Sequence, residues 1–153
     1  MRNRLKLAIG VGILLGSSVL TASGAGAARE RIQSKQLQAF VEALRLAAPP
    51  QRPNDGMYSD WQVLPGIIPN WTKQCVGKAM SPAAFDADRA AARETVSCIA
   101  GRELDRRLRS TGDSKLAVRQ AACWWMTGKD NGCETGATAE YVRRVEKFYR
   151  QQL

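Results

Sequence analysis

The chain contains four cysteines and no histidine, and this combination restricts its fold more than any other sequence feature. The cysteines are Cys75, Cys98, Cys123 and Cys133. A zinc site usually needs cysteine pairs separated by two to four residues, and no pair here has that spacing. An even number of cysteines in an exported chain favours two disulfides. We therefore expect disulfide bonds, with no metal site and no cofactor.

The first 27 residues have the three parts of a secretory signal peptide. A positively charged start precedes an apolar run at 7–20, and a small-residue cleavage pattern follows at 25–27. The alternative is a retained membrane anchor, but about 1.5 Å of rise per residue leaves this run short of the roughly 30 Å hydrocarbon core. We therefore predict cleavage after Ala27, a single mature domain at 28–153, and a periplasmic or extracellular location.

Cleavage would remove three of the 23 basic residues and none of the 14 acidic ones, so the net charge would fall from +9 to +6. A basic surface can attract an anionic cell-wall polymer. Because the basic residues are scattered among acids, an ordinary solvated surface is the favoured interpretation. Nucleic-acid binding is disfavoured, since export removes the chain from the cytoplasm and no dense basic run exists. Membrane contact is expected only through the uncleaved signal peptide.

Apolar residues recur at three- and four-residue steps along much of the chain, which predicts an all-α fold. We expect about four helices and one short helix, joined into a small disulfide-linked bundle. The predicted long helices cover 29–47, about 82–111, 114–127 and the segment after 129–136, and the short helix begins at Asn70. Prolines at Pro49, Pro50, Pro53, Pro65 and Pro69 predict an extended loop, whose apolar residues should pack across the helices.

Two disulfide pairings are geometrically reasonable. The turn at 130–132 can bring Cys133 back to Cys123, leaving Cys75 to pair with Cys98. Alternatively, an antiparallel helix hairpin around Gly112 would place Cys98 beside Cys123, so that Cys75 would pair with Cys133. Sequence cannot decide among the possible connectivities, and we slightly favour the pairing of neighbours.

Two adjacent tryptophans, Trp124 and Trp125, lie between the last two cysteines. Neighbouring residues on a helix point about 100° apart, so the two indoles cannot face the same core contact. Trp125 continues the apolar stripe, and Trp124 is the more exposed candidate. A structural role would place Trp124 under the proline-rich loop with its N–H bonded to a carbonyl. A functional role would make it a binding platform, together with Trp61 and Trp71.

Catalytic mechanisms that use histidine are excluded, because the chain has none. Two carboxyl groups can cleave a glycosidic bond, and Asp130 and Glu134 are weak candidates for such a pair. The stretch TAEYVRRVEKFY, at 138–149, is similar to the closing helix of bacterial soluble lytic transglycosylase domains, which resemble lysozyme. The chain lacks that family's Glu-Ser catalytic segment and its Gly-Leu-Met-Gln stretch, so the resemblance implies no catalytic residue here.

The sequence therefore predicts an exported helical binding or accessory protein of the cell envelope without catalytic activity. Its partner would be another envelope protein or an anionic cell-wall polymer. The first predicted contact surface is Trp124 with the loop at 128–136. The second comprises basic helix faces that include Arg106, Arg107, Arg143 and Arg144. The alternative is a small peptidoglycan-cleaving hydrolase or lyase.

Overall fold

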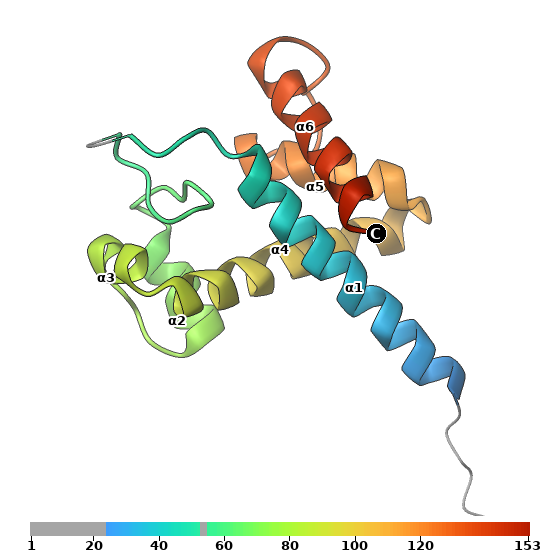
Figure 1. Ribbon diagram of the computed structural model, residues 1–153, viewed down its shortest axis with the longest axis horizontal. Helices are drawn as coiled ribbons and strands as arrows, with labels where there is room; N and C mark the ends of the chain where they lie inside the picture. Colours follow the sequence, from blue (N-terminus) through green and yellow to red (C-terminus); the bar gives the residue numbers. More distant parts are fainter. Residues whose placement is uncertain (1–23, 53–54) are drawn as a thin grey trace, which may run out of the picture.

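The computed structural model describes residues 24–52 and 55–153 and contains, within them, six helices and no strand (Figure 1). The helices are α1 (Gly24–Ala47), α2 (Ile68–Val76), α3 (Pro82–Ala87), α4 (Arg89–Thr111), α5 (Ser114–Thr127) and α6 (Gly136–Gln152). The all-α prediction is confirmed. Most of the predicted signal peptide, residues 1–23, lies outside the described residues. Among the described helices, none combines the length and apolar character needed to cross a membrane.

The helices pack around one core, in which α1 lies against α6 and α4 forms a hairpin with α5 (Figure 1). Fully buried side chains from these four helices meet at its centre. They are Phe40, Leu44, Val96, Val118 and Val145. The short helices α2 and α3 cover the first half of α4. Burying this apolar surface on folding supplies the main driving force, about 25 cal/mol per Å².

Single residues that favour the end or the start of a helix lie at the ends of α4 and α5. Gly112 ends α4 and Gly128 ends α5, each with a positive φ (66° and 76°) that glycine adopts at low cost. Asp113 caps α5 by accepting a hydrogen bond from the backbone N–H of Leu116 at 3.0 Å. These residues fix the directions of the chain around both ends of α5.

Three helix boundaries differ from the prediction. The first helix begins at Gly24 instead of residue 29. The long helix expected from residue 82 is interrupted at Asp88, which leaves helical geometry (φ −108°, ψ 87°) and caps α4 through the N–H of Ala91. The short helix begins at Ile68 instead of Asn70, and it has no side-chain cap at its start. Asp88 starts α4 because its side chain caps that helix, and α2 can begin before Asn70 because Pro69 is tolerated in the first turn of a helix.

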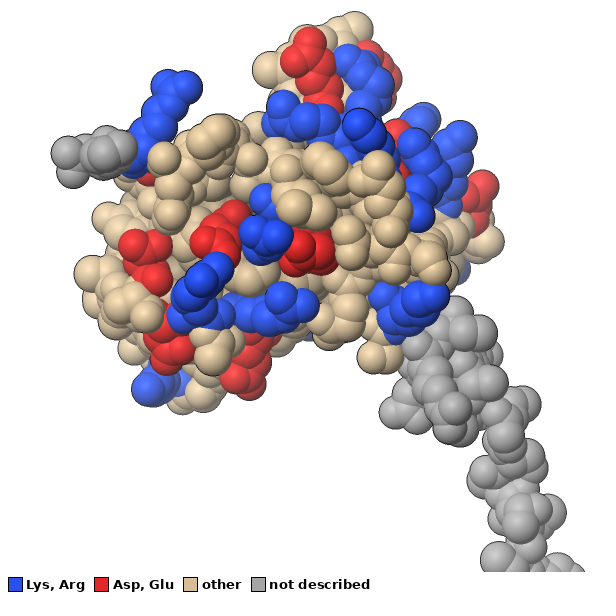
Figure 2. All heavy atoms as spheres, in the orientation of Figure 1, with Lys and Arg blue, Asp and Glu red and all other residues tan. Residues whose placement is uncertain are grey.

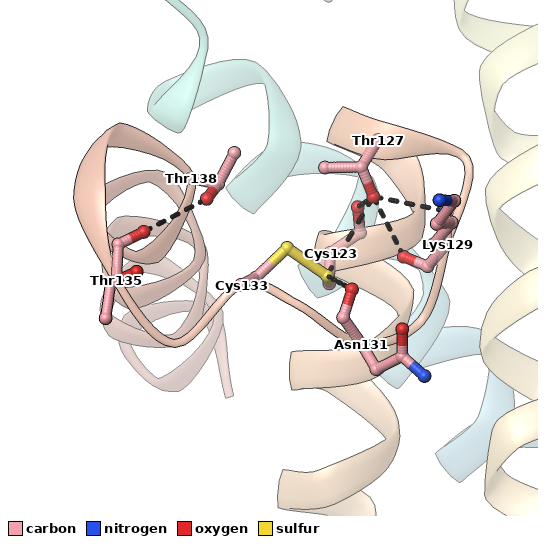
Figure 3. The surroundings of a disulfide bond; sticks show 7 residues. All are labelled: Cys123, Thr127, Lys129, Asn131, Cys133, Thr135 and Thr138. Atoms are coloured by element: carbon pink, nitrogen blue, oxygen red, sulfur yellow. Dashed lines mark hydrogen bonds between the residues drawn. A yellow bond between two sulfur atoms is a disulfide. The ribbon is translucent and has the colours of Figure 1, made fainter.

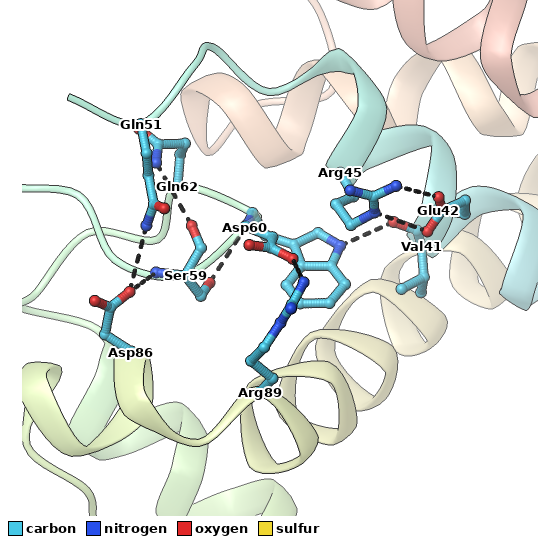
Figure 4. Close-up of polar contacts among 10 residues, drawn as sticks. Val41, Glu42, Arg45, Gln51, Ser59, Asp60, Gln62, Asp86 and Arg89 are labelled. Carbon is cyan, nitrogen blue, oxygen red and sulfur yellow. Dashed lines mark hydrogen bonds and ion pairs between the residues drawn. The ribbon is translucent and has the colours of Figure 1, made fainter.

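The proline-rich loop between α1 and α2 packs on the helices, as predicted. Trp61 and Val63 are 5% and 2% exposed, and Val63 forms backbone hydrogen bonds with Tyr58. The carboxylate of Asp86 on α3 accepts a hydrogen bond from the backbone N–H of Ser59 at 2.7 Å (Figure 4). The loop is therefore fixed to the helices by burial and by polar contacts.

Candidate functional site

The structure pairs Cys75 with Cys98 and Cys123 with Cys133, the arrangement slightly favoured from the sequence. The first bridge joins α2 to the middle of α4, with a Cα–Cα distance of 5.9 Å. Trp71 lies one helical turn before Cys75, so this bridge also fixes the indole of Trp71 beside the α4–α5 hairpin.

Three tryptophans form a continuous cluster, which we call the aromatic wall: Trp71, Trp124 and Trp125. The ring centroids of Trp71 and Trp124 are 6.4 Å apart with planes 18° from parallel, and those of Trp71 and Trp125 are 5.5 Å apart at 44°. Such offset and tilted pairs stabilise a structure beyond simple burial. The guanidinium of Arg107 lies 5.8 Å from the ring centroid of Trp124, within cation–π range.

An apolar groove of about 110 Å³ lies beside the aromatic wall, between the proline-rich loop, α2, α5 and α6. Trp71 and Trp125 contribute to its lining, as do Trp61 and Tyr141. Leu64 and Met126 also line the groove, and they remain 56% and 45% exposed. Exposed large apolar side chains beside tryptophans are unusual on the surface of a monomer and mark candidate contact surfaces.

Individual tryptophans have contacts that differ from those expected. Trp124 and Trp125 are both half-buried, so neither is the clearly exposed member of the pair. The hydrogen bond from an indole N–H to a carbonyl, expected for Trp124, is made instead by Trp61, which donates to the carbonyl of Val41 at 2.9 Å (Figure 4). Trp61 therefore belongs mainly to the core and presents only an edge to the groove.

The predicted basic faces do not form one open surface. Arg107 is only 2% exposed and donates to the carboxylate of Glu103, which also pairs with Arg106. Arg144 donates to the backbone carbonyl of Ala47 at 2.9 Å and thereby caps the end of α1. Arg143 is exposed and has no such partner in the described part of the chain. On the face shown in Figure 2, basic and acidic side chains are interspersed.

A second cavity, which we call the α5–α6 cleft, lies on the other side of α5 and has a volume of about 480 Å³. The bridge between Cys123 and Cys133 forms part of its wall and closes the loop between the two helices (Figure 3). Thr127 stiffens this loop by donating a hydrogen bond to the carbonyl of Lys129 at 3.0 Å. Asp130 and Glu134, both exposed, line the cleft.

A third carboxylate in the cleft, Glu146, was not identified from the sequence. It is 7% exposed, and its two oxygens accept hydrogen bonds from Arg119 at 3.0 and 3.5 Å. The available signal was its position on α6, in the buried stripe that contains Val142, Val145 and Tyr149. A charged residue inside such a stripe indicates a paired or functional group.

The described residues contain no group of three or more histidine, cysteine or acidic side chains that could hold a metal ion. The three cleft carboxylates are therefore best considered with the arginines around them. The chain matches no protein-family model, no curated protein and no solved structure.

Proposed function

We propose that this protein is an exported, non-catalytic binding or accessory protein of the cell envelope, and that its apolar groove binds an apolar segment of another envelope protein. Export is supported by the signal-like sequence at 1–27. The two disulfides suit an oxidising compartment, which is where such bonds persist.

The observation that carries the proposal is the exposure of Leu64 (56%) and Met126 (45%) on a groove lined by Trp71 and Trp125. Tryptophan and methionine are enriched where proteins bind each other, because they bury a large apolar area. A neighbouring disulfide and the packed proline-rich loop hold the groove in place. Little ordering entropy would then be lost on binding, which favours affinity.

A protein segment is favoured over an anionic polymer because of the charges around the aromatic wall. Arg107, whose guanidinium lies against the ring of Trp124, is already paired with Glu103. An anion would have to compete with this intramolecular carboxylate. An apolar side chain would instead cover Leu64 and Met126 without breaking an ion pair.

The test is site-specific photo-crosslinking of the full-length protein in intact cells of its source. A photoreactive phenylalanine analogue replaces Leu64 or Met126. A control protein carries it at Gln33 on α1, about 21 Å from the end of that helix at Ala47. We expect the same cross-linked protein from both groove positions and none from the control. Equal cross-linking from all three positions, or none from the groove, would overturn the proposal.

A matched pair of substitutions separates binding from folding. Leu64→Asp combined with Met126→Asp places charge in the groove and should abolish the cross-link from a probe at Met57, which also lines it. Leu116→Asp changes a leucine that is similarly exposed (42%) but lies in the α5–α6 cleft, and it should leave the cross-link unchanged. Both variants should retain the wild-type helical circular dichroism.

A second candidate function, cleavage of peptidoglycan, is favoured by one observation: Asp130 and Glu134 line a single cleft together with Glu146. Two carboxyl groups at suitable separation can cleave a glycosidic bond. The test is to incubate the oxidised protein with insoluble peptidoglycan and measure released sugar fragments. Release that disappears in Asp130→Asn and Glu134→Gln would support an enzyme, whereas pelleting without release would support a wall-binding protein.

A further inference from the structure

The α5–α6 cleft is separate from the apolar groove, because the two share no lining residue. The two helices run in opposite directions, because Arg119 of α5 contacts Glu146 of α6 and Cys123 is bridged to the loop before α6. Glu146 also lines a second depression of about 300 Å³, which continues along the same two helices. The two hollows therefore share a wall and offer one elongated binding surface.

Charges of opposite sign lie at the two ends of this surface. Asp130 and Glu134 are at the loop end, where the cleft is closed by the disulfide. Lys115 and Arg150 line the depression at the far end, near the start of α5 and the end of α6. All four side chains are exposed, and none makes an ion pair in the described part of the chain.

The walls of the cleft also supply a different kind of contact. Leu116 is 42% exposed, and the buried Val142 and Ala139 also line the cleft. The only ion pair there is Arg119 with Glu146, which satisfies the buried carboxylate within the protein. A ligand is thus offered apolar contacts along the cleft, uncompensated carboxylates at the loop end, and uncompensated basic groups at Arg143 on the wall and at the far end.

We propose that this surface binds a short extended peptide with a free ammonium group and a free carboxylate. The ammonium group would lie near Asp130 and Glu134, and the carboxylate near Lys115 and Arg150. From Cys123 to Lys115 the helix rises about 12 Å. An extended tetrapeptide spans about 13 Å, so four residues match this length.

The test is calorimetric titration of the oxidised protein with the tetrapeptide Ala-Leu-Leu-Ala. Its termini are free in one sample and acetylated and amidated in the other. We expect the free peptide to bind about ten-fold more tightly, with about three-fold from each exposed charge contact. Equal affinity for the free and the doubly blocked peptide would overturn the proposal, and so would an absence of binding.

Variants assign each terminus to its end of the cleft. Asp130→Asn with Glu134→Gln should weaken binding of the free peptide about three-fold and leave the acetylated peptide unaffected. Lys115→Gln with Arg150→Gln should also weaken binding of the free peptide about three-fold, because the peptide carboxylate loses its basic partners. The amidated peptide, which has no carboxylate, should be unaffected. The assignment would be overturned if the acidic pair of variants depended on the peptide carboxylate, or the basic pair on the peptide ammonium group.

Control substitutions test whether the charge effects are local. Lys73→Gln with Lys78→Gln removes two exposed basic residues outside the cleft and should change nothing. Nuclear magnetic resonance then locates the peptide. The side-chain amides of Gln120 and Asn131, which line the cleft, should shift on binding, whereas shifts confined to the indole N–H groups would contradict this site.

Leu64→Asp with Met126→Asp should leave peptide affinity unchanged, so the fate of this proposal is independent of the envelope-partner proposal.

Discussion

The two sides of α5 differ in chemistry although each is fixed by one disulfide. On one side, Trp124 and Trp125 meet Trp71 on α2, and the adjoining groove is almost entirely apolar. On the other side, Arg119 and Cys123 line a cleft in which carboxylates and arginines alternate with apolar residues. A single 14-residue helix thus presents two unlike surfaces. The comparison shows that each disulfide joins segments that form a different surface of the bundle.

The largest expected effect comes from removing either disulfide. Cys75→Ser with Cys98→Ser opens a loop of 23-residue separation, and Cys123→Ser with Cys133→Ser opens one of 10. Loop-closure entropy predicts a loss of roughly 3 kcal/mol in the free energy of unfolding for each, about 0.7 kcal/mol more for the longer loop. Urea denaturation measures both. A greater loss for the shorter loop would show that cleft contacts outweigh chain entropy.

Trp71→Ala should have the next largest effect, because it removes the indole that contacts both tryptophans of α5. We expect a loss of about 2 kcal/mol in the free energy of unfolding, less than for a fully buried tryptophan. A double-mutant cycle with Trp124→Ala should give a coupling of about 1 kcal/mol. If the two losses add without coupling, the aromatic wall is only a set of separately buried rings.

Alkaline pH should destabilise the fold through Tyr141, which lines the apolar groove. Burial raises the pKa of Tyr141 above its ordinary value of 10.0, although Arg144 acts in the opposite direction. The folded state therefore holds this proton more tightly than the unfolded state. The resulting stability is fully present below pH 10 and is lost as the pH rises above it, by up to about 1.4 kcal/mol per unit.

The pH effect is measured by urea denaturation at pH 8.5 and pH 11. Tyr141→Phe keeps the ring but removes the ionisable hydroxyl, so it should reduce the loss at high pH. Burial also raises the pKa of Tyr149, which explains why part of the loss should remain. An identical loss in the wild type and in Tyr141→Phe would contradict the burial argument.

The smallest effect is expected on the cleft side, at the pair of Arg119 and Glu146. Arg119→Gln should lower the free energy of unfolding by about 1 kcal/mol, because the buried carboxylate loses hydrogen bonds from a side chain that is 54% exposed. Adding Glu146→Gln should recover most of this loss, since the uncompensated charge is gone. Thermal denaturation of the wild type and of these two variants measures both changes. No recovery in the double variant would show that Glu146 needs no charged partner.

The sequence predicts features whose cause lies within one turn of chain. Gly112 and Gly128 act on their own helix ends and were assigned correctly, whereas the sequence left the cap of α5 open between Asp113 and Ser114. The break at Asp88 was missed because an aspartate near the start of a helix is also compatible with the helix continuing. Nothing local marks Asp88 as the start of a new one.

The sequence was less informative about the candidate sites, whose contacts join distant segments. Trp61 bonds to Val41 across 20 residues, and Glu146 pairs with Arg119 across 27. The spacing of residues along the sequence indicates neither of these contacts. The acidic residue within the apolar stripe of α6 was visible, but its meaning depended on which arginine the fold would bring to it.

The neighbour-to-neighbour connectivity of the disulfides also has a consequence for biosynthesis. When a chain crosses a membrane N-terminus first, Cys98 is the next thiol to emerge after Cys75, and Cys133 is the next after Cys123. Each cysteine therefore meets its native partner before a competing thiol arrives. If the chain is exported as proposed, sequential oxidation would therefore yield the native bonds without an enzyme that reshuffles mispaired bridges.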